Sequence, residues 1–288
     1  MRPGVSFFWP TRSVRYSGRM GQRGGGAIQA LDLTRCYGSL VAVDHLSFSS
    51  AAGSIFGLLG PNGAGKSTLI KMLTTLLPPT SGAALVAGFD IVRQPARVRA
   101  HIGYVSQMLS ADGELTGYEN LLISAKLYGI HRKERAPRIA EALEFMELTE
   151  AASRRVKQYS GGMIRRLELA QSMLHRPAVL FLDEPTIGLD PVAKRSVWER
   201  IRELRERFGT AILITTHDME EADELCDTVA VLHHGRIAAL GSPARLKAAV
   251  GAEATMNDVF IYYTGASIAQ GGDFSDVART RRTARRLE

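Results

Sequence analysis

A glycine-rich stretch at residues 60–68 constrains the fold of this 288-residue chain more than any other feature. It follows a short apolar run at 54–59, and it reads Gly60-Pro61-Asn62-Gly63-Ala64-Gly65-Lys66-Ser67-Thr68. Glycines let the backbone wrap so that several N–H groups point at phosphate oxygens, and a helix that follows turns its positive end toward the same anion. In such a P-loop Lys66 reaches the β- and γ-phosphates and Ser67 ligates Mg²⁺. The motif therefore predicts nucleotide phosphate binding between a strand and a helix.

An apolar strand that ends in two acids is the second feature. Residues 179–182 are Val-Leu-Phe-Leu, and Asp183 and Glu184 follow them directly. In a parallel sheet this strand end lies beside the P-loop, where Asp183 can help hold Mg²⁺ and Glu184 can polarise an attacking water. A strand end with two solvated acids is the alternative, and the P-loop makes it the weaker one.

A serine followed by two glycines opens a later helix. Ser160, Gly161 and Gly162 lie between Tyr159 and Met163. Helix N-termini offer free N–H groups to anions, so this motif suggests a second contact with the nucleotide. On its own the pattern is weak, because a serine cap followed by glycine is common; its place before the acidic strand makes it more specific.

The remaining sequence alternates between strand and helix patterns, which is typical of an α/β core with a largely parallel sheet. Residues 114–176 interrupt the alternation and read as a helical insertion, opened by a capping box from Thr116 to Glu119. His233-His234-Gly235 reads as a hairpin turn, and two adjacent histidines in such a turn would chelate a metal poorly. Strands are expected within 28–59 and at 83–87, 102–106, 179–182 and 211–215, and helices at 65–77, 160–175 and 190–208, with another starting at Ser242-Pro243.

Charge and hydropathy argue against a nucleic-acid surface. The net charge is +7, but residues 1–26 hold five arginines and no acid, and residues 279–288 hold five arginines against Glu288. The body between these tails therefore carries a net charge of −2. The tails are expected to be solvated and disordered, with contact to acidic lipid headgroups as the alternative.

The apolar runs are too short to cross a bilayer, and the N-terminus lacks a convincing secretory signal.

The two cysteines, Cys36 and Cys226, lie far apart in the sequence. They form neither a metal-ligand spacing nor a disulfide framework, which fits a reducing cytoplasm.

With these motifs the chain resembles the ABC transporter ATPase family over nearly all of residues 28–263. The motifs follow the family's order: the P-loop, Gln107, Ser-Gly-Gly, the acidic strand, Gly188-Leu189-Asp190 and His217. The stretches Tyr159–Met163, Pro185–Pro191 and Met256–Phe260 are similar to the drug- and antibiotic-exporting subgroup related to daunorubicin-resistance ATPases.

The resemblance implies a P-loop NTPase fold with a RecA-like core sheet, an antiparallel β subdomain and an inserted α-helical subdomain. It implies an ABC ATPase domain over 27–250, with the helical insertion at about 114–176. A disordered arginine-rich extension would precede it over 1–26, and a C-terminal extension with a basic tail would follow over 251–288.

The resemblance also implies how the site works. Two copies would meet head to tail with two ATP molecules between them, each held by one P-loop and capped by the other copy's Ser160 and Gly162. Glu184, His217, Lys66 and Gln107 would be catalytic, and Ser67, Gln107 and Asp183 would hold Mg²⁺. The set implied to contact the nucleotide is Tyr37, Gly60, Pro61, Asn62, Gly63, Ala64, Gly65, Lys66, Ser67, Thr68, Gln107, Ser160, Gly161, Gly162, Asp183 and Asp190.

Four of the residues that the resemblance implicates also have an alternative interpretation as ordinary structural or surface residues. Tyr37, implied to stack on adenine, could be an ordinary packed aromatic, and Gln107 could be a surface polar group. Asp190, implied to connect the two sites across the dimer, also suits a helix N-cap before Pro191. His217, implied to contact the γ-phosphate, could be a surface histidine.

The signature departs from the family's usual form, since Tyr159 and Met163 replace the leucine and glutamine at its ends. Ser160 and Gly162 remain, so capping of ATP is expected to survive.

The implied function is ATP hydrolysis that powers transport, with export of a lipophilic drug or antibiotic through a separate permease. The subunit would lie at the cytoplasmic face of the cell membrane as a peripheral protein. A soluble ABC-type ATPase acting on nucleic acid or the ribosome is the alternative, and the non-basic body and the room for only one such domain disfavour it.

Overall fold

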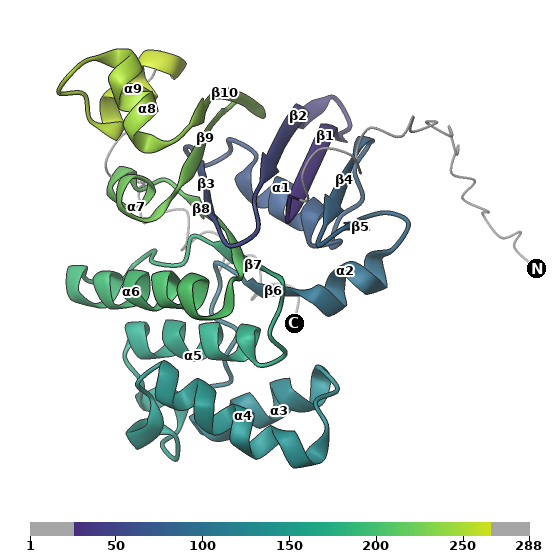
Figure 1. Cartoon of the computed structure of the whole chain (residues 1–288), viewed down its shortest axis with the longest axis vertical. Coiled ribbons are helices and arrows are strands. Elements are labelled where there is room, and N and C mark those ends of the chain that lie inside the picture. The colour runs from purple at the N-terminus through teal and green to yellow at the C-terminus, as the bar shows by residue number, and fades with distance from the viewer. Residues whose placement is uncertain (1–25, 266–288) are drawn as a thin grey trace, which may run out of the picture.

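Two β-sheets carry the fold of residues 26–265, the part of the chain that the computed structural model describes (Figure 1). The expectations for the two arginine-rich tails lie outside this range. The larger sheet has the order β10-β9-β3-β8-β7-β6, and the smaller has the order β2-β1-β4-β5. The strands are β1 (Ile28–Tyr37), β2 (Leu40–Ser50), β3 (Ile55–Leu59), β4 (Ser81–Val86), β5 (Phe89–Asp90), β6 (Ile102–Val105), β7 (Val179–Asp183), β8 (Ala211–Thr216), β9 (Thr228–His233) and β10 (Arg236–Gly241).

The larger sheet is parallel from β6 to β9, and only β10 runs antiparallel to its neighbour. All neighbouring strands of the smaller sheet are antiparallel. The α/β core and the separate antiparallel sheet therefore match the fold expected from the sequence.

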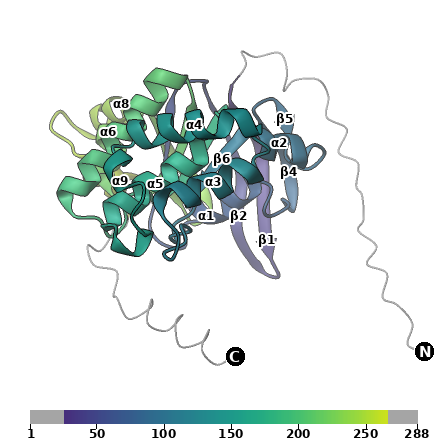
Figure 2. The ribbon, with the colours of Figure 1, turned by 90° about the horizontal axis from the view of Figure 1, so that it is seen from below.

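The helices lie on both sides of the larger sheet and below it in Figure 1. Helices α3, α4 and α5 form the lower part of the molecule, and they lie in front of the sheet when it is seen from below (Figure 2). The helices are α1 (Lys66–Leu73), α2 (Pro95–His101), α3 (Gly117–Leu127), α4 (Arg132–Phe145), α5 (Gly161–Met173), α6 (Pro191–Phe208), α7 (Met219–Leu225), α8 (Pro243–Val250) and α9 (Met256–Thr264).

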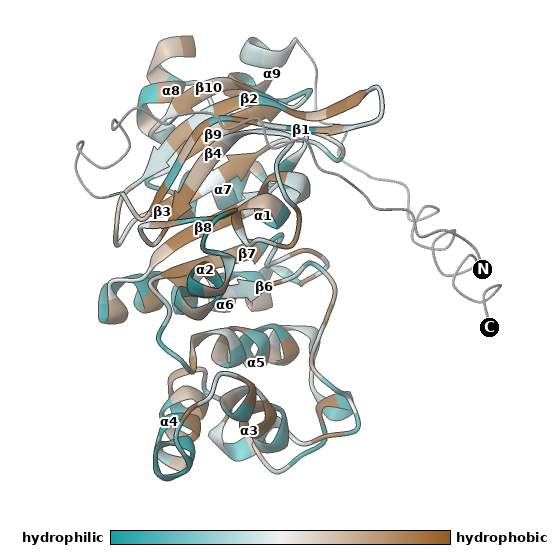
Figure 3. Ribbon diagram, turned by 90° about the vertical axis from the view of Figure 1, so that its right-hand side faces the viewer, coloured by the Kyte–Doolittle hydropathy of each residue, from teal (hydrophilic) through white to brown (hydrophobic). Residues whose placement is uncertain are grey.

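Strand alternation divides the core into two clusters. Ile55 and Leu59 of β3 pack into the cluster that contains α5, α6 and α7, whereas Phe56 and Leu58 pack into the cluster that contains α1 and the smaller sheet. Successive strand residues point to opposite faces, so a central strand covered on both faces must be apolar throughout. Figure 3 shows this as ribbon that is mostly brown along the central strands.

Several expected elements are confirmed, and their bounds differ slightly. The capping box at Thr116 opens α3, with both reciprocal hydrogen bonds to Glu119 present. His234 and Gly235 form the two-residue turn between β9 and β10, with φ of 47° and 76°. Helix α5 ends at Met173, two residues before the expected end.

The first helix is shorter than the sequence indicates. Helix α1 ends at Leu73 and not at Leu77. The Thr74 hydroxyl donates to the Ile70 carbonyl at 2.8 Å, and Thr75 has a φ of 64°. A left-handed residue cannot continue an α-helix, so the chain turns before Pro78.

Helix α9, the last helix within residues 26–265, packs on the body of the fold. Met256, Val259 and Phe260 are buried in the same cluster as α7 and α8. Within residues 26–265 the structure has no helix that is both long and apolar enough to cross a membrane.

Candidate active site

The P-loop joins β3 to α1, and its backbone requires glycine at the start of the helix. Gly65 caps α1 with a φ of 104°, a conformation that residues with a Cβ rarely adopt. A Cβ at this position would lie 2.4 Å from the carbonyl oxygen of Ala42. The loop can therefore wrap closely against β2 only because the side chain is absent.

Lys66 fills the centre of this loop. Its side chain is 4% exposed, and Nζ donates to the carbonyl oxygens of Gly60 at 2.6 Å and Pro61 at 3.2 Å. Nζ also lies 3.2 Å from Oε1 of Glu184. Burial lowers the pKa of Lys66, and the charges of Glu184 and Asp183 oppose this shift. The P-loop thus places the ammonium group of Lys66 where it can bind an anion.

Asp183 lies at the carboxyl end of β7, beside the P-loop. Its Oδ1 accepts hydrogen bonds from Ser67 Oγ, at 3.3 Å, and from Thr215 Oγ1. A serine hydroxyl and a carboxylate are oxygen ligands of the kind that Mg²⁺ prefers, so this pair fits the expected ion. Thr215 was not identified from the sequence, because its place opposite Asp183 depends on the register of β7 and β8.

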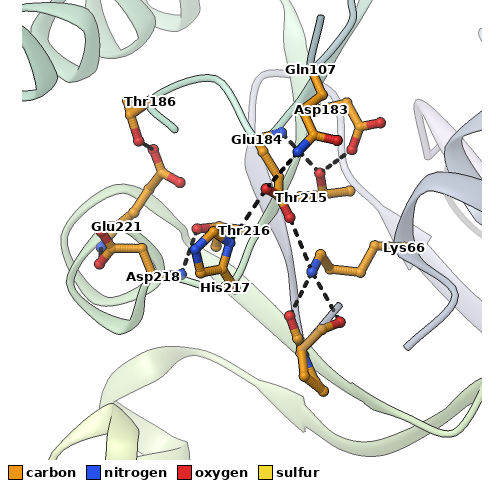
Figure 4. A network of polar contacts seen from close by, with 12 residues as sticks. Lys66, Gln107, Asp183, Glu184, Thr186, Thr215, Thr216, His217, Asp218 and Glu221 are labelled. Carbon is orange, nitrogen blue, oxygen red and sulfur yellow. Dashed lines mark hydrogen bonds and ion pairs between the residues drawn. The ribbon is translucent and has the colours of Figure 1, made fainter. Parts of the chain in front are cut away.

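The carboxylate of Glu184 contacts three of the predicted site residues, which are Lys66, Gln107 and His217 (Figure 4). Besides the contact with Lys66, its Oε2 accepts from Gln107 Nε2 at 3.3 Å and lies 3.4 Å from His217 Nδ1. The backbone of Glu184 has a φ of 50°, and its N–H donates to Oγ1 and the carbonyl oxygen of Thr215. Two hydrogen bonds therefore fix the unusual backbone that aims this side chain at the P-loop.

These contacts keep Glu184 ionised. Burial raises the pKa of its carboxyl group, but His217 and Lys66 outweigh burial and lower the pKa overall. The contact with Glu184 in turn raises the pKa of His217, against the effect of burial. The site thus combines a carboxylate base with a histidine that readily carries a proton.

The Ser-Gly-Gly motif and Asp190 form neighbouring helix starts. Ser160 caps α5 through a hydrogen bond from the Met163 N–H, and Asp190 caps α6 through bonds from the Val192 and Ala193 N–H groups. Ser160 and Gly161 are exposed. Within residues 26–265, no hydrogen bond or ion pair joins Ser160, Gly161 or Gly162 to the P-loop. The cap interpretation of Asp190 is confirmed.

Tyr37 lies at the end of β1, apart from the contacts around Glu184. It is 45% exposed, and the Arg35 guanidinium lies 4.8 Å from the centre of its ring. The ring is therefore partly open to stacking, and its predicted contact with adenine stays a prediction.

Comparison with known proteins gives the family. The family model described as ABC transporter matches residues 43–187. The daunorubicin/doxorubicin resistance ATP-binding protein DrrA of Streptomyces peucetius is 45% identical over 225 residues, which cover 78% of this chain and 68% of that protein. This chain belongs to the ABC transporter family.

Other members are similar in sequence and in structure. The Nod factor export ATP-binding protein I of Sinorhizobium fredii is 45% identical over 217 residues, or 75% of this chain and 63% of that protein. A solved ATP-binding subunit of an ABC transporter has a TM-score of 0.73 at 29% identity, over 82% of this chain and 99% of that one.

Family membership confirms that the chain is an ATP-binding subunit with ATPase activity coupled to transport, and that its fold is the ABC type. These relatives give no support to the nucleic-acid or ribosome alternative. The roles of individual site residues stay predictions.

Proposed function

We propose that this subunit powers export of a lipophilic drug or antibiotic through a separate transmembrane permease. The similarity to relatives named for daunorubicin or doxorubicin resistance supports the substrate class. Transporter ATPases work beside their permeases, so we place the subunit peripherally at the cytoplasmic face of the cell membrane.

The observation that carries the hydrolytic role is the contact between Glu184 and Lys66, at 3.2 Å inside the P-loop. A phosphate chain in this loop would take hydrogen bonds from the backbone and from Lys66. Glu184, ionised and oriented by Gln107 and His217, would accept a proton from the attacking water. His217, with its raised pKa, would stabilise charge on the γ-phosphate.

Ser67, Asp183 and Gln107 would hold Mg²⁺ through their side-chain oxygens. When bound, Mg²⁺ would neutralise charge on the β- and γ-phosphates. Thr215 would keep the Asp183 carboxylate oriented by its hydrogen bond.

A second copy would complete each site. The N-terminus of α5 is exposed at Ser160 and Gly161, and its N–H groups could donate hydrogen bonds to an anion. Val192 is exposed at the start of α6, next to this helix end, and an apolar side chain there suits an interface. We infer a head-to-tail dimer in which Asp190 lies near the contact between copies and Tyr37 stacks on adenine.

The permease would dock near the loop that carries Gln107. Met108 is 81% exposed in this loop, and the next residue, Leu109, is also exposed. Tyr118 is exposed at the start of α3. Exposed apolar side chains of this kind are typical of surfaces that bind another protein.

The test is drug transport in vesicles that hold the complete complex of this chain and its permease. Addition of ATP and Mg²⁺ should drive uptake of daunorubicin into inside-out vesicles, followed by its fluorescence. The Glu184→Gln variant should retain ATP but lose about 10²–10⁴-fold in hydrolysis, because loss of a general base costs a factor of that size.

Active ATP hydrolysis without movement of daunorubicin, or of any of a panel of lipophilic drugs and antibiotics, would remove the proposed substrate class. Unchanged hydrolysis by Glu184→Gln would remove the proposed role of the carboxylate.

A further inference from the structure

The loop that carries Gln107 is fastened to helix α5 by a buried arginine. The side chain of Arg165 is 3% exposed. Its Nη1 donates to the Ser106 carbonyl at 2.8 Å, and its Nη2 donates to the Gln107 carbonyl at 3.2 Å. The planar guanidinium thereby holds two successive peptide groups in one orientation.

Glu168 holds the far end of the same loop. Its side chain is 2% exposed, and Oε2 lies 3.0 Å from Nη1 of Arg165. Its Oε1 accepts hydrogen bonds from the N–H and the hydroxyl of Ser110. The two residues of this ion pair therefore bind both ends of the segment 106–110: Arg165 binds the carbonyls of Ser106 and Gln107, and Glu168 binds Ser110.

These bonds matter because the loop has little packing of its own. The side chains of Gln107, Met108, Leu109 and Ser110 are all exposed. Withdrawing two charges from water is costly, and removing one partner of such a pair leaves the other without compensation. The position of the loop is therefore set mainly by Arg165 and Glu168.

We propose that Arg165 and Glu168 are positioning residues that place Gln107 against Glu184 and make the loop move together with the start of α5. This inference rests on the proposed role of Gln107 in hydrolysis. Helix α5 begins at Gly161, about one turn before Arg165. A displacement of that helix end by the second copy's nucleotide would carry the Gln107 loop with it.

The test is a double-mutant cycle on ATP hydrolysis by the full chain in complex with its permease. The variants are Arg165→Lys, Gln107→Ala and their combination. Lysine keeps the charge beside Glu168 but cannot hold both carbonyls with a planar fork. We expect Arg165→Lys to lower kcat on the order of tenfold with little change in KM for ATP, because a small misplacement of a catalytic group is enough to do so.

If Arg165 acts through Gln107, the combined variant is no slower than Gln107→Ala alone. Arg166→Lys is the matched control, because Arg166 follows in the sequence but bonds to the Met146 carbonyl and to Glu147. That control should hydrolyse ATP at the wild-type rate.

Thermal melting followed by circular dichroism checks that each variant is folded. If Arg165→Lys has a lower melting temperature than the wild-type protein, Ser110→Ala replaces it in the cycle. The Ser110→Ala substitution removes only the hydroxyl of an exposed residue that donates to Glu168. It should lower kcat only about two- to fivefold, because the Ser110 N–H still donates to Glu168 and the variant loses the modest net contribution of a single hydrogen bond. Its effect should vanish beside Gln107→Ala.

The outcomes separate the two levels of the proposal. Additive losses in the cycle, or wild-type kcat in folded Arg165→Lys and Ser110→Ala, would overturn the positioning role while leaving the role of Gln107 intact. A Gln107→Ala variant with wild-type kcat would overturn both.

Discussion

The two glycines of the Ser-Gly-Gly motif should respond differently to alanine. A Cβ on Gly162 would lie 2.9 Å from the Cβ of Ala193 in α6, about 0.5 Å short of the 3.4 Å at which ordinary contact begins. A Cβ on Gly161 would meet only Cδ2 of Leu189, at 3.3 Å, the far end of a flexible side chain. Gly162 therefore allows the starts of α5 and α6 to lie close together, whereas Gly161 is not needed for this close packing.

Both variants gain helix propensity at neighbouring positions, so the difference between them isolates the overpacking. Overpacking a well-packed site costs about 1–3 kcal/mol. At about 2–4 °C per kcal/mol, we expect Gly162→Ala to melt about 2–12 °C below Gly161→Ala.

The assay is thermal unfolding of the two variants side by side, followed by circular dichroism, with urea titration at 25 °C to compare free energies of unfolding. A Gly162→Ala protein that is as stable as Gly161→Ala would refute the packing argument and leave nucleotide contact as the only role for Gly162.

Three further predictions follow from the site. Lys66→Ala should weaken ATP binding about 10- to 100-fold, as judged by calorimetry, because a charge-assisted hydrogen bond contributes about 1.5–3 kcal/mol. Asp190→Asn should keep the cap on α6 whereas Asp190→Ala should lose about 1 kcal/mol of stability; a loss of ATPase activity in the asparagine variant alone would reveal a further role for the charge. Since Glu184 raises the pKa of His217, the stability advantage over His217→Gln should be full below pH 6.5 and fade as the pH rises through the raised pKa; melting curves from pH 5.5 to 8.5 check this.

Much of the site was accessible from the sequence because its motifs report local backbone geometry. The P-loop glycines, the acids after an apolar strand and the serine before two glycines each describe one strand end or one helix start. The structure brings Lys66, Gln107 and His217 around Glu184, and these are the four residues that the family resemblance implied to be catalytic.

The parts that escaped the sequence depend on contacts between distant segments. Thr215 gains its role only from the register of β7 and β8. Arg165 and Glu168 look like solvated charges on a helix, and only the packing of residues 106–110 on α5 buries them. Helix α2 was also missed, although Pro95 at its first position is a recognised start signal.

Assembly of the Glu184→Gln protein in response to ATP tests the main proposal most directly. Sedimentation velocity with Mg²⁺ and ATP should show a dimer that reverts to monomer when nucleotide is removed. Adding Ser160→Arg, which blocks the exposed start of α5, should abolish the dimer while each monomer still binds ATP. A Glu184→Gln protein that binds ATP and stays monomeric, or a dimer that forms equally well with Ser160→Arg, would contradict a site completed by the second copy.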